Sequence, residues 1–86
     1  MSHSVFLHPD VERYLDSLAQ SERERCYLSL KRLTKDPYKS RSGCHVKKMG
    51  GSKSYYRLRV GNNRFLYVIE GSEVFVEEAF KRGKGY

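Results

Sequence analysis

The chain has 86 residues, 38% of them hydrophobic, and a formal net charge of +7. This length fits a single domain with a small core, and the apolar content argues against a disordered chain. No apolar run approaches the roughly 20 residues that span a bilayer, and the N-terminus lacks a basic segment followed by an apolar one, so we expect a cytoplasmic protein with no membrane partner.

The N-terminal part predicts one strand and a first helix. Residues 4–8 form a short apolar run that Pro9 ends. Pro9 and Asp10 then begin a helix, because proline is tolerated in the first turn and an acidic residue complements the positive helix end. The apolar residues of this helix follow the spacing i, i+3, i+4, i+7, at Val11, Tyr14, Leu15 and Leu18.

A second helix is predicted to begin at Ser21, which forms a capping box with Glu24. Asp36 and Pro37 end it, since the residue before a proline is driven out of helical geometry. Residues 19–20 leave only a short link between the two helices, which predicts an antiparallel helical hairpin. The apolar side of the second helix comprises Cys26, Tyr27, Leu30 and Leu33.

The remaining chain predicts an antiparallel sheet. The run over 64–70 is mostly apolar and is expected to be a central strand. Helices followed by strands indicate an α+β fold, a small antiparallel sheet with the N-terminal helical hairpin packed on one face. Gly-rich or Asn-rich turns at 50–52, 61–63 and 71–72 separate the strands expected at 44–49, 55–60, 64–70 and 73–80.

Positive charge is concentrated in the middle of the chain. Clustered like charges repel one another and destabilise a fold unless an anion binds, and polyphosphate is the commonest such partner. A solvated charged face is the alternative. Between Pro37 and Ile69 there is no Asp or Glu but there are eight basic residues, Lys39, Arg41, Lys47, Lys48, Lys53, Arg57, Arg59 and Arg64.

Strand alternation groups several arginines into a candidate phosphate site. The pattern predicts that Arg57 and Arg59 project from the same face, about 7 Å apart. The turn that follows places Arg64 near Arg59 on the neighbouring strand. These guanidinium groups, with Arg82, are suited to stabilising charge on the phosphoryl oxygens when a 2′-hydroxyl attacks a phosphodiester. Arginine is a poor general base because it stays protonated.

Tyrosines and lysines supply further RNA-binding candidates. Tyr55 and Tyr86 are suited to stack on a base or to position a proton. The alternatives are a core position, which the alternation assigns to Tyr56, and an unstructured chain end for Tyr86. The RNA-binding candidates are Tyr55, Lys47, Lys48, Lys53, Lys81 and Lys84.

Other catalytic schemes are disfavoured, and we expect no metal and no cofactor. Metal-dependent phosphoryl transfer needs a carboxylate cluster, whereas Glu77 and Glu78 are neighbours on a strand and are predicted to face opposite ways. The three histidines lack metal-ligand spacing, and an ordinary surface role is favoured for His45. Cys26 and Cys44 have no paired motif and are expected to be free thiols.

The sequence from Tyr56 to Ile69, YRLRVGNNRFLYVI, followed by Lys81-Arg82 and Tyr86, resembles the RelE/ParE superfamily of toxins from type II toxin–antitoxin systems. The helical hairpin before a basic segment is similar too, and the resemblance covers nearly the whole chain. It implies a single toxin domain over residues 1–86 with the β-α-α-β-β-β, microbial ribonuclease-like RelE fold. In the RelE branch it implies an endoribonuclease (mRNA interferase) that cleaves mRNA in the ribosomal A site without a metal and inhibits translation.

The resemblance also implies roles for individual residues. Arg57 and Arg59 match two positions where RelE toxins often place lysines, and Arg64 matches the arginine that binds the scissile phosphate. Arg82 matches the arginine after the last strand, and Tyr86 the C-terminal tyrosine that stacks on or orients the substrate. The general base is then left open, and the lysines that remain as candidates for it are Lys47, Lys48 and Lys53.

The partners implied by the resemblance are a cognate antitoxin, the ribosome and mRNA. The antitoxin would be small and acidic, would form a hetero-oligomer with the toxin, and would compete with RNA for one salt-sensitive surface. A ParE-like gyrase inhibitor without ribonuclease activity is one alternative, disfavoured by the joint presence of Arg64, Arg82 and Tyr86. A non-catalytic RNA-binding or ribosome-binding module is the other.

Overall fold

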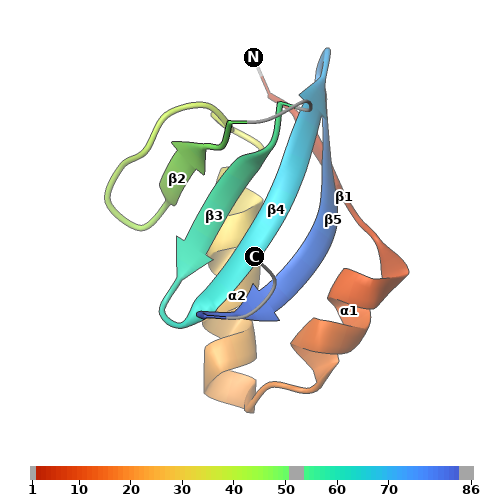
Figure 1. Ribbon diagram of the computed structural model, residues 1–86, viewed down its shortest axis with the longest axis vertical. Helices are drawn as coiled ribbons and strands as arrows, with labels where there is room; N and C mark the ends of the chain where they lie inside the picture. Colours follow the sequence, from red (N-terminus) through yellow and green to blue (C-terminus); the bar gives the residue numbers. More distant parts are fainter. Residues whose placement is uncertain (1, 51–53, 84–86) are drawn as a thin grey trace.

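The computed structural model describes residues 2–50 and 54–83. No helix within these ranges is long and apolar enough to cross a membrane. In chain order the elements are β1 (Ser4–Leu7), α1 (Pro9–Asp16), α2 (Gln20–Arg32), β2 (His45–Lys48), β3 (Tyr56–Val60), β4 (Asn63–Glu70) and β5 (Glu73–Lys81) (Figure 1).

The strands form one sheet in the order β1-β5-β4-β3-β2, with both helices on one face (Figure 1). The α+β class, the helical hairpin on one face and the central position of β4 are confirmed. The sheet is mixed rather than wholly antiparallel, because β1 pairs in parallel with β5. These two strands are not joined by a hairpin turn, so nothing forces them to run in opposite directions. The short edge strand β2 confirms the strand expected at 44–49, and with it the sheet has five strands, whereas the order β-α-α-β-β-β implied by the resemblance has four.

The start of α1 agrees with its prediction. Pro9 occupies the first turn, and His8 Nδ1 accepts a hydrogen bond from the backbone N–H of Asp10 at 3.0 Å. Val11 and Leu15 are fully buried. The expected proline start and apolar side of this helix are therefore confirmed.

The start of α2 differs from its prediction. The helix begins at Gln20 and no side chain caps it, so the capping box expected at Ser21 is wrong. The link is held instead by Arg23, whose guanidinium donates to the carbonyl oxygens of Leu15 at 3.2 Å and Leu18 at 3.0 Å. Carbonyls at a helix end lack partners within the helix, so this contact stabilises the helical hairpin.

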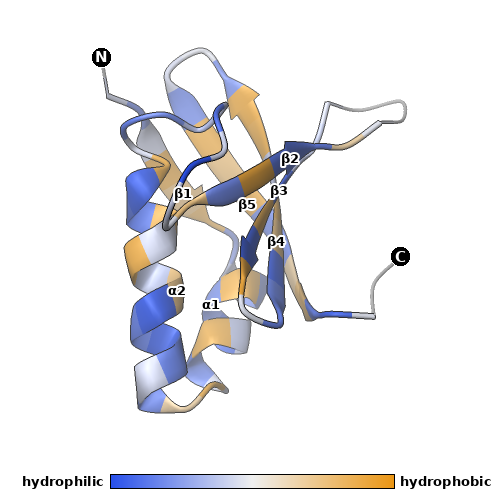
Figure 2. Cartoon of the chain, turned by 90° about the vertical axis from the view of Figure 1, so that its left-hand side faces the viewer, coloured by the Kyte–Doolittle hydropathy of each residue, from blue (hydrophilic) through white to orange (hydrophobic). Residues whose placement is uncertain are grey.

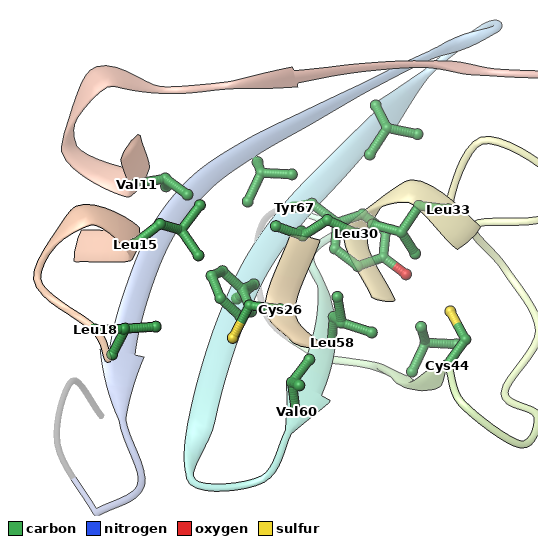
Figure 3. Packing of buried hydrophobic residues seen from close by; sticks show 14 residues of the cluster. Val11, Leu15, Leu18, Cys26, Leu30, Leu33, Cys44, Leu58, Val60 and Tyr67 are labelled. Atoms are coloured by element: carbon green, nitrogen blue, oxygen red, sulfur yellow. The ribbon is translucent and has the colours of Figure 1, made fainter. Parts of the chain in front are cut away.

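The hydrophobic core lies between the two helices and the covered face of the sheet (Figure 3). Leu15 and Leu30 reach it from the helices, and Leu58 and Tyr67 from the sheet. Burying one such side chain stabilises the folded state by about 1.5–3 kcal/mol. Both cysteines are buried free thiols, as expected. Tyr27 departs from its predicted core position, because it lies 41% exposed.

A β-bulge interrupts the alternation of β5. Val76 and Ala79 both pack on the covered face, toward the helices. The two residues between them, Glu77 and Glu78, therefore both lie on the open face, which is the face of the sheet away from the helices. The predicted placement of these carboxylates on opposite faces is therefore wrong. One extra residue opposite Leu66 and Tyr67 in β4 causes the change.

Candidate functional site

A cavity of about 710 Å³ lies at the β3–β4 turn and is lined by side chains of the sheet and of α2. Figure 2 shows hydrophilic residues both at the end of this hairpin and along the outer side of α2. Among the residues that the structure describes, six arginines and no carboxylate line the cavity. The lining residues are Arg25, Leu28, Ser29, Arg32, Gly43, His45, Arg57, Arg59, Val60, Gly61, Arg64 and Arg82.

The sheet supplies four of these arginines. Arg59 pairs with Arg64 across the β3–β4 ladder, and Arg57 lies two residues away on the same face. The expected grouping of these three side chains on one face is confirmed. Arg82 follows β5, and its backbone N–H donates to the carbonyl oxygen of Asn62 at 2.7 Å, which ties it to the β3–β4 turn.

Arg64 is the most buried of the cavity's arginines, with 9% of its surface exposed. Its Nη1 donates to the carbonyl oxygen of Gly61 at 2.8 Å and to that of Asn63 at 3.3 Å. These acceptors orient the guanidinium without contributing a negative charge. Gly61 has a φ of +59°, a conformation that favours glycine, so the turn that supplies the acceptor depends on this residue.

A second polar cluster lies directly beneath, on the covered face. Asn63 is fully buried; its Oδ1 accepts from the Tyr14 hydroxyl at 2.5 Å, and its Nδ2 donates to Glu22 Oε2 at 2.8 Å and to the Val60 carbonyl at 3.1 Å. Burial is the main cause that raises the pKa of Tyr14, so the hydroxyl keeps the proton it donates. We call Tyr14, Glu22 and Asn63 the Asn63 cluster; it anchors the turn to both helices.

The remaining wall of the cavity comes from α2. Arg25, Leu28, Ser29 and Arg32 follow the spacing i, i+3, i+4, i+7 and therefore form one stripe along the helix. We call these four residues the α2 stripe. The spacing of the α2 stripe is visible in the sequence, but whether the stripe faces the cavity or the solvent is decided by how α2 packs.

His45 also lines the cavity, where it pairs with Arg59 across the β2–β3 ladder. The sequence favoured an ordinary surface role for His45, because its position beside the arginines depends on how β2 pairs with β3. Imidazole is a side-chain group that serves as a general acid or base. His45 therefore places a group suited to proton transfer among groups suited to binding phosphate.

Several predicted RNA-binding residues lie away from the cavity. Lys47 is on the open face, in register with Arg57, but is not among the lining residues. Lys48 pairs with Tyr56 and so lies toward the covered face. Tyr56 itself stacks on the buried Tyr67 at 5.6 Å between ring centroids, which confirms its predicted core position.

Two further candidates are engaged by carboxylates. The Tyr55 hydroxyl donates to Glu77 Oε1 at 2.8 Å, and this hydrogen bond is the main cause that raises the pKa of Tyr55. Lys81 Nζ lies 3.8 Å from Glu22 Oε2, on the helix side of the sheet. The other three candidates lie outside the described residues: Lys53, Lys84 and Tyr86.

Structure comparison identifies proteins with this fold. The chain is similar to a chain of the archaeal RelE–RelB complex from Pyrococcus horikoshii OT3, with 25% identity and a TM-score of 0.82 over 99% of this chain and 100% of that one. It is similar to a chain of the toxin–antitoxin complex RelBE2 from Mycobacterium tuberculosis, with 17% identity and a TM-score of 0.79 over 95% and 100%. A mutant of E. coli toxin RelE in the free state matches with 16% identity and a TM-score of 0.64 over 98% and 86%. No protein-family model and no curated protein sequence matches the chain. The resemblance to RelE toxins is confirmed at the level of the fold.

Proposed function

We propose that this chain with the RelE fold is the toxin of a type II toxin–antitoxin pair, a ribosome-dependent endoribonuclease that cleaves mRNA in the A site. The similarity to RelE–RelB complexes supports a toxin with an antitoxin partner. The observation that carries the nuclease proposal is the convergence of Arg57, Arg59, Arg64 and Arg82 on one cavity.

Cleavage by an RNA 2′-hydroxyl fits this arrangement of charges. The 2′ oxygen forms a bond to the adjacent phosphorus while the bond from phosphorus to the 5′ oxygen breaks, and negative charge accumulates on the non-bridging oxygens. Guanidinium groups donate pairs of hydrogen bonds to such oxygens. Arg64, oriented by two backbone carbonyls, is placed to hold the scissile phosphate. This charge stabilisation requires no metal ion.

The proton on the 2′ oxygen needs an acceptor, which arginine cannot provide. His45 is the residue we assign to this step, because it lines the cavity beside Arg59. In its neutral form it accepts the 2′ proton as general base, and water supplies the proton that the leaving 5′ oxygen takes up. Of the three lysines considered as bases from the sequence, Lys47 and Lys48 do not line the cavity, and Lys53 lies outside the described residues.

The partners follow from the same surface. A polyanionic RNA strand and an acidic antitoxin are both attracted to a cavity lined by arginines, so the two compete, and added salt weakens both interactions. Action on ribosomes places the protein in the cytoplasm.

The decisive experiment adds the purified protein to ribosomes programmed with a defined mRNA and maps cuts by primer extension. Cuts at A-site codons that disappear in Arg64→Ala and Arg82→Ala are the expected result. Lys31→Ala, a charge removed from an exposed position outside the cavity, is the matched control and retains the cuts. Intact ribosome binding without cuts in the wild type would leave only a binding module, and inhibition of DNA gyrase in a parallel assay would indicate a ParE-like toxin.

A further inference from the structure

We infer that α2 carries a second half of the RNA-binding site: the strand held by the sheet arginines continues past the β3–β4 turn onto the α2 stripe. The inference deepens the proposed function and rests on it for the identity of the polyanion as RNA. It assigns binding roles to Arg25, Leu28 and Arg32, which lie on a helix rather than on the sheet.

The β3–β4 turn joins the two halves. The Gly61 carbonyl oxygen accepts from Arg64 Nη1 at 2.8 Å. A side chain placed on Gly61 would lie 3.8 Å from Arg25 Nη2, so the Arg25 guanidinium approaches the same turn from the helix side. Guanidinium groups from the sheet and from α2 therefore flank one glycine, and the positive surface is continuous between them.

The far end of the stripe is also held in place. Arg32 Nη1 donates to the Gly43 carbonyl oxygen at 2.9 Å, and Ser29 Oγ donates to the same oxygen at 3.2 Å. A Cβ atom on Gly43 would clash with the Arg32 guanidinium, and Gly43 has a φ of +77°. Only glycine at this position lets Arg32 lie against the cavity wall, so the charge is oriented before a ligand arrives.

The dimensions and chemistry of the stripe suit a single strand. Arg25 and Arg32 are seven residues apart, about 10 Å along the helix, which corresponds to about three phosphates of a stacked strand. Leu28, 53% exposed, lies between them and offers an apolar surface to a base. Since no carboxylate lines the cavity among the described residues, a polyanion is the ligand whose charge the whole surface complements.

Binding of RNA that cannot be cleaved tests this inference. The probe is a labelled 2′-O-methyl oligonucleotide of about twelve nucleotides, with affinity measured between about 50 and 200 mM salt. Each lost phosphate contact lowers the salt slope by about 0.7, so Arg25→Ala/Arg32→Ala is expected to lower it by about 1.4 and to weaken binding about tenfold. A tetranucleotide, too short to reach both halves, is expected to show less dependence on the two arginines.

The matched control is Lys31→Ala/Lys35→Ala, which removes the same charge from exposed positions outside the cavity. A salt slope that is the same in both double variants, or no binding by the wild type, would overturn the inference. So would an unchanged RNA affinity together with lost binding of an acidic peptide, which would assign the stripe to a protein partner. Because Arg32 also contacts Gly43, Arg25→Ala alone, with an expected slope change of about 0.7, is measured as well.

Failure of this inference and failure of the proposed function have different signatures. RNA binding that depends on Arg25 and Arg32, without cuts on ribosomes, would contradict the nuclease proposal and support the second half-site. Cuts on ribosomes, with RNA binding that does not depend on the two arginines, would support the nuclease proposal and contradict the second half-site.

Discussion

Asn63 and Arg64 are consecutive residues of β4, and both are buried polar side chains, yet their surroundings are opposite. Asn63 points to the helices, where Tyr14, Glu22 and the Val60 carbonyl all bond to its amide. Arg64 points to the open face, into a cavity that it shares with five other arginines among the described residues.

The difference separates a group that stabilises the fold from one that prepares a function. A buried polar group whose hydrogen bonds are all formed stabilises the fold modestly. Leaving its partners unpaired lowers the free energy of unfolding by about 1–3 kcal/mol. Several like charges around one cavity have the opposite effect on stability, because they repel one another until an anion binds. Substitutions at the two positions should therefore act on different observables.

The largest effect is expected at Arg64. Arg64→Ala should lower the rate of mRNA cleavage by about 10³, because it removes donors aimed at the developing charge. The free energy of unfolding should change by less than about 1 kcal/mol, since relief of repulsion offsets the lost packing. Single-turnover cleavage and urea unfolding measure the two quantities. Arg64→Lys keeps the charge and should recover part of the rate; full activity in Arg64→Ala would contradict the assignment.

His45 should show the next largest effect. His45→Gln is expected to slow cleavage by about 10², the usual magnitude for a general base. Single-turnover cleavage on programmed ribosomes measures the rate. Lys47→Ala is the comparison, since its rate should match the wild type. An undiminished rate in His45→Gln would transfer the proton step to another group.

Asn63 tests the structural side of the comparison. Asn63→Ala leaves the Tyr14 hydroxyl and Glu22 without their partner and should lower the free energy of unfolding by about 2–3 kcal/mol. Asn62→Ala, in the exposed turn beside it, should cost less than about 0.5 kcal/mol. Urea titrations followed by circular dichroism give both values. Equal stabilities for the two variants would mean that the Asn63 cluster does not anchor the turn.

The smallest effect concerns Cys26, a fully buried thiol on α2. Burial is the main cause, with the Glu22 charge second, that raises the pKa of Cys26 to about 11. A folded pKa above the unfolded one stabilises the protein below the unfolded value of about 8.5 and loses that contribution as pH rises toward 11. Wild type should therefore lose more stability than Cys26→Ala between about pH 8.5 and 11. Parallel curves for the two proteins would contradict this.

Much of the fold could be predicted because hydrophobic periodicity reports it directly. The spacing of Val11 and Leu15 defined α1, and the alternation around Leu58 defined β3. The parallel pairing of β1 with β5 could not be predicted, since it depends on contacts between segments distant in sequence. The capping box at Ser21 was outweighed by a tertiary contact, the bond from Arg23 to the end of α1.

The sheet half of the site followed from strand alternation, which placed Arg57, Arg59 and Arg64 on one face. The helical half did not, because whether Arg25 and Arg32 face the sheet or the solvent is decided by how α2 packs. His45 was missed for a similar reason: its place in the cavity depends on the register of β2 against β3. The alternation within one strand can be predicted from its own sequence, whereas the contact between two elements depends on how they pack.

The bulge at Glu77 and Glu78 reverses which face of the sheet each later residue of β5 points to. If Glu77 took an ordinary place in the ladder, strict alternation from Val76 would turn Arg82 toward the helices and Lys81 outward. With the bulge, Lys81 meets Glu22 and Arg82 reaches the cavity. Deleting Glu77 would restore a regular ladder and leave both cations on their present faces. A single backbone irregularity more than ten ångströms along the strand from Arg82, about five residues at 3.3 Å each, therefore determines which cation is available to a phosphate.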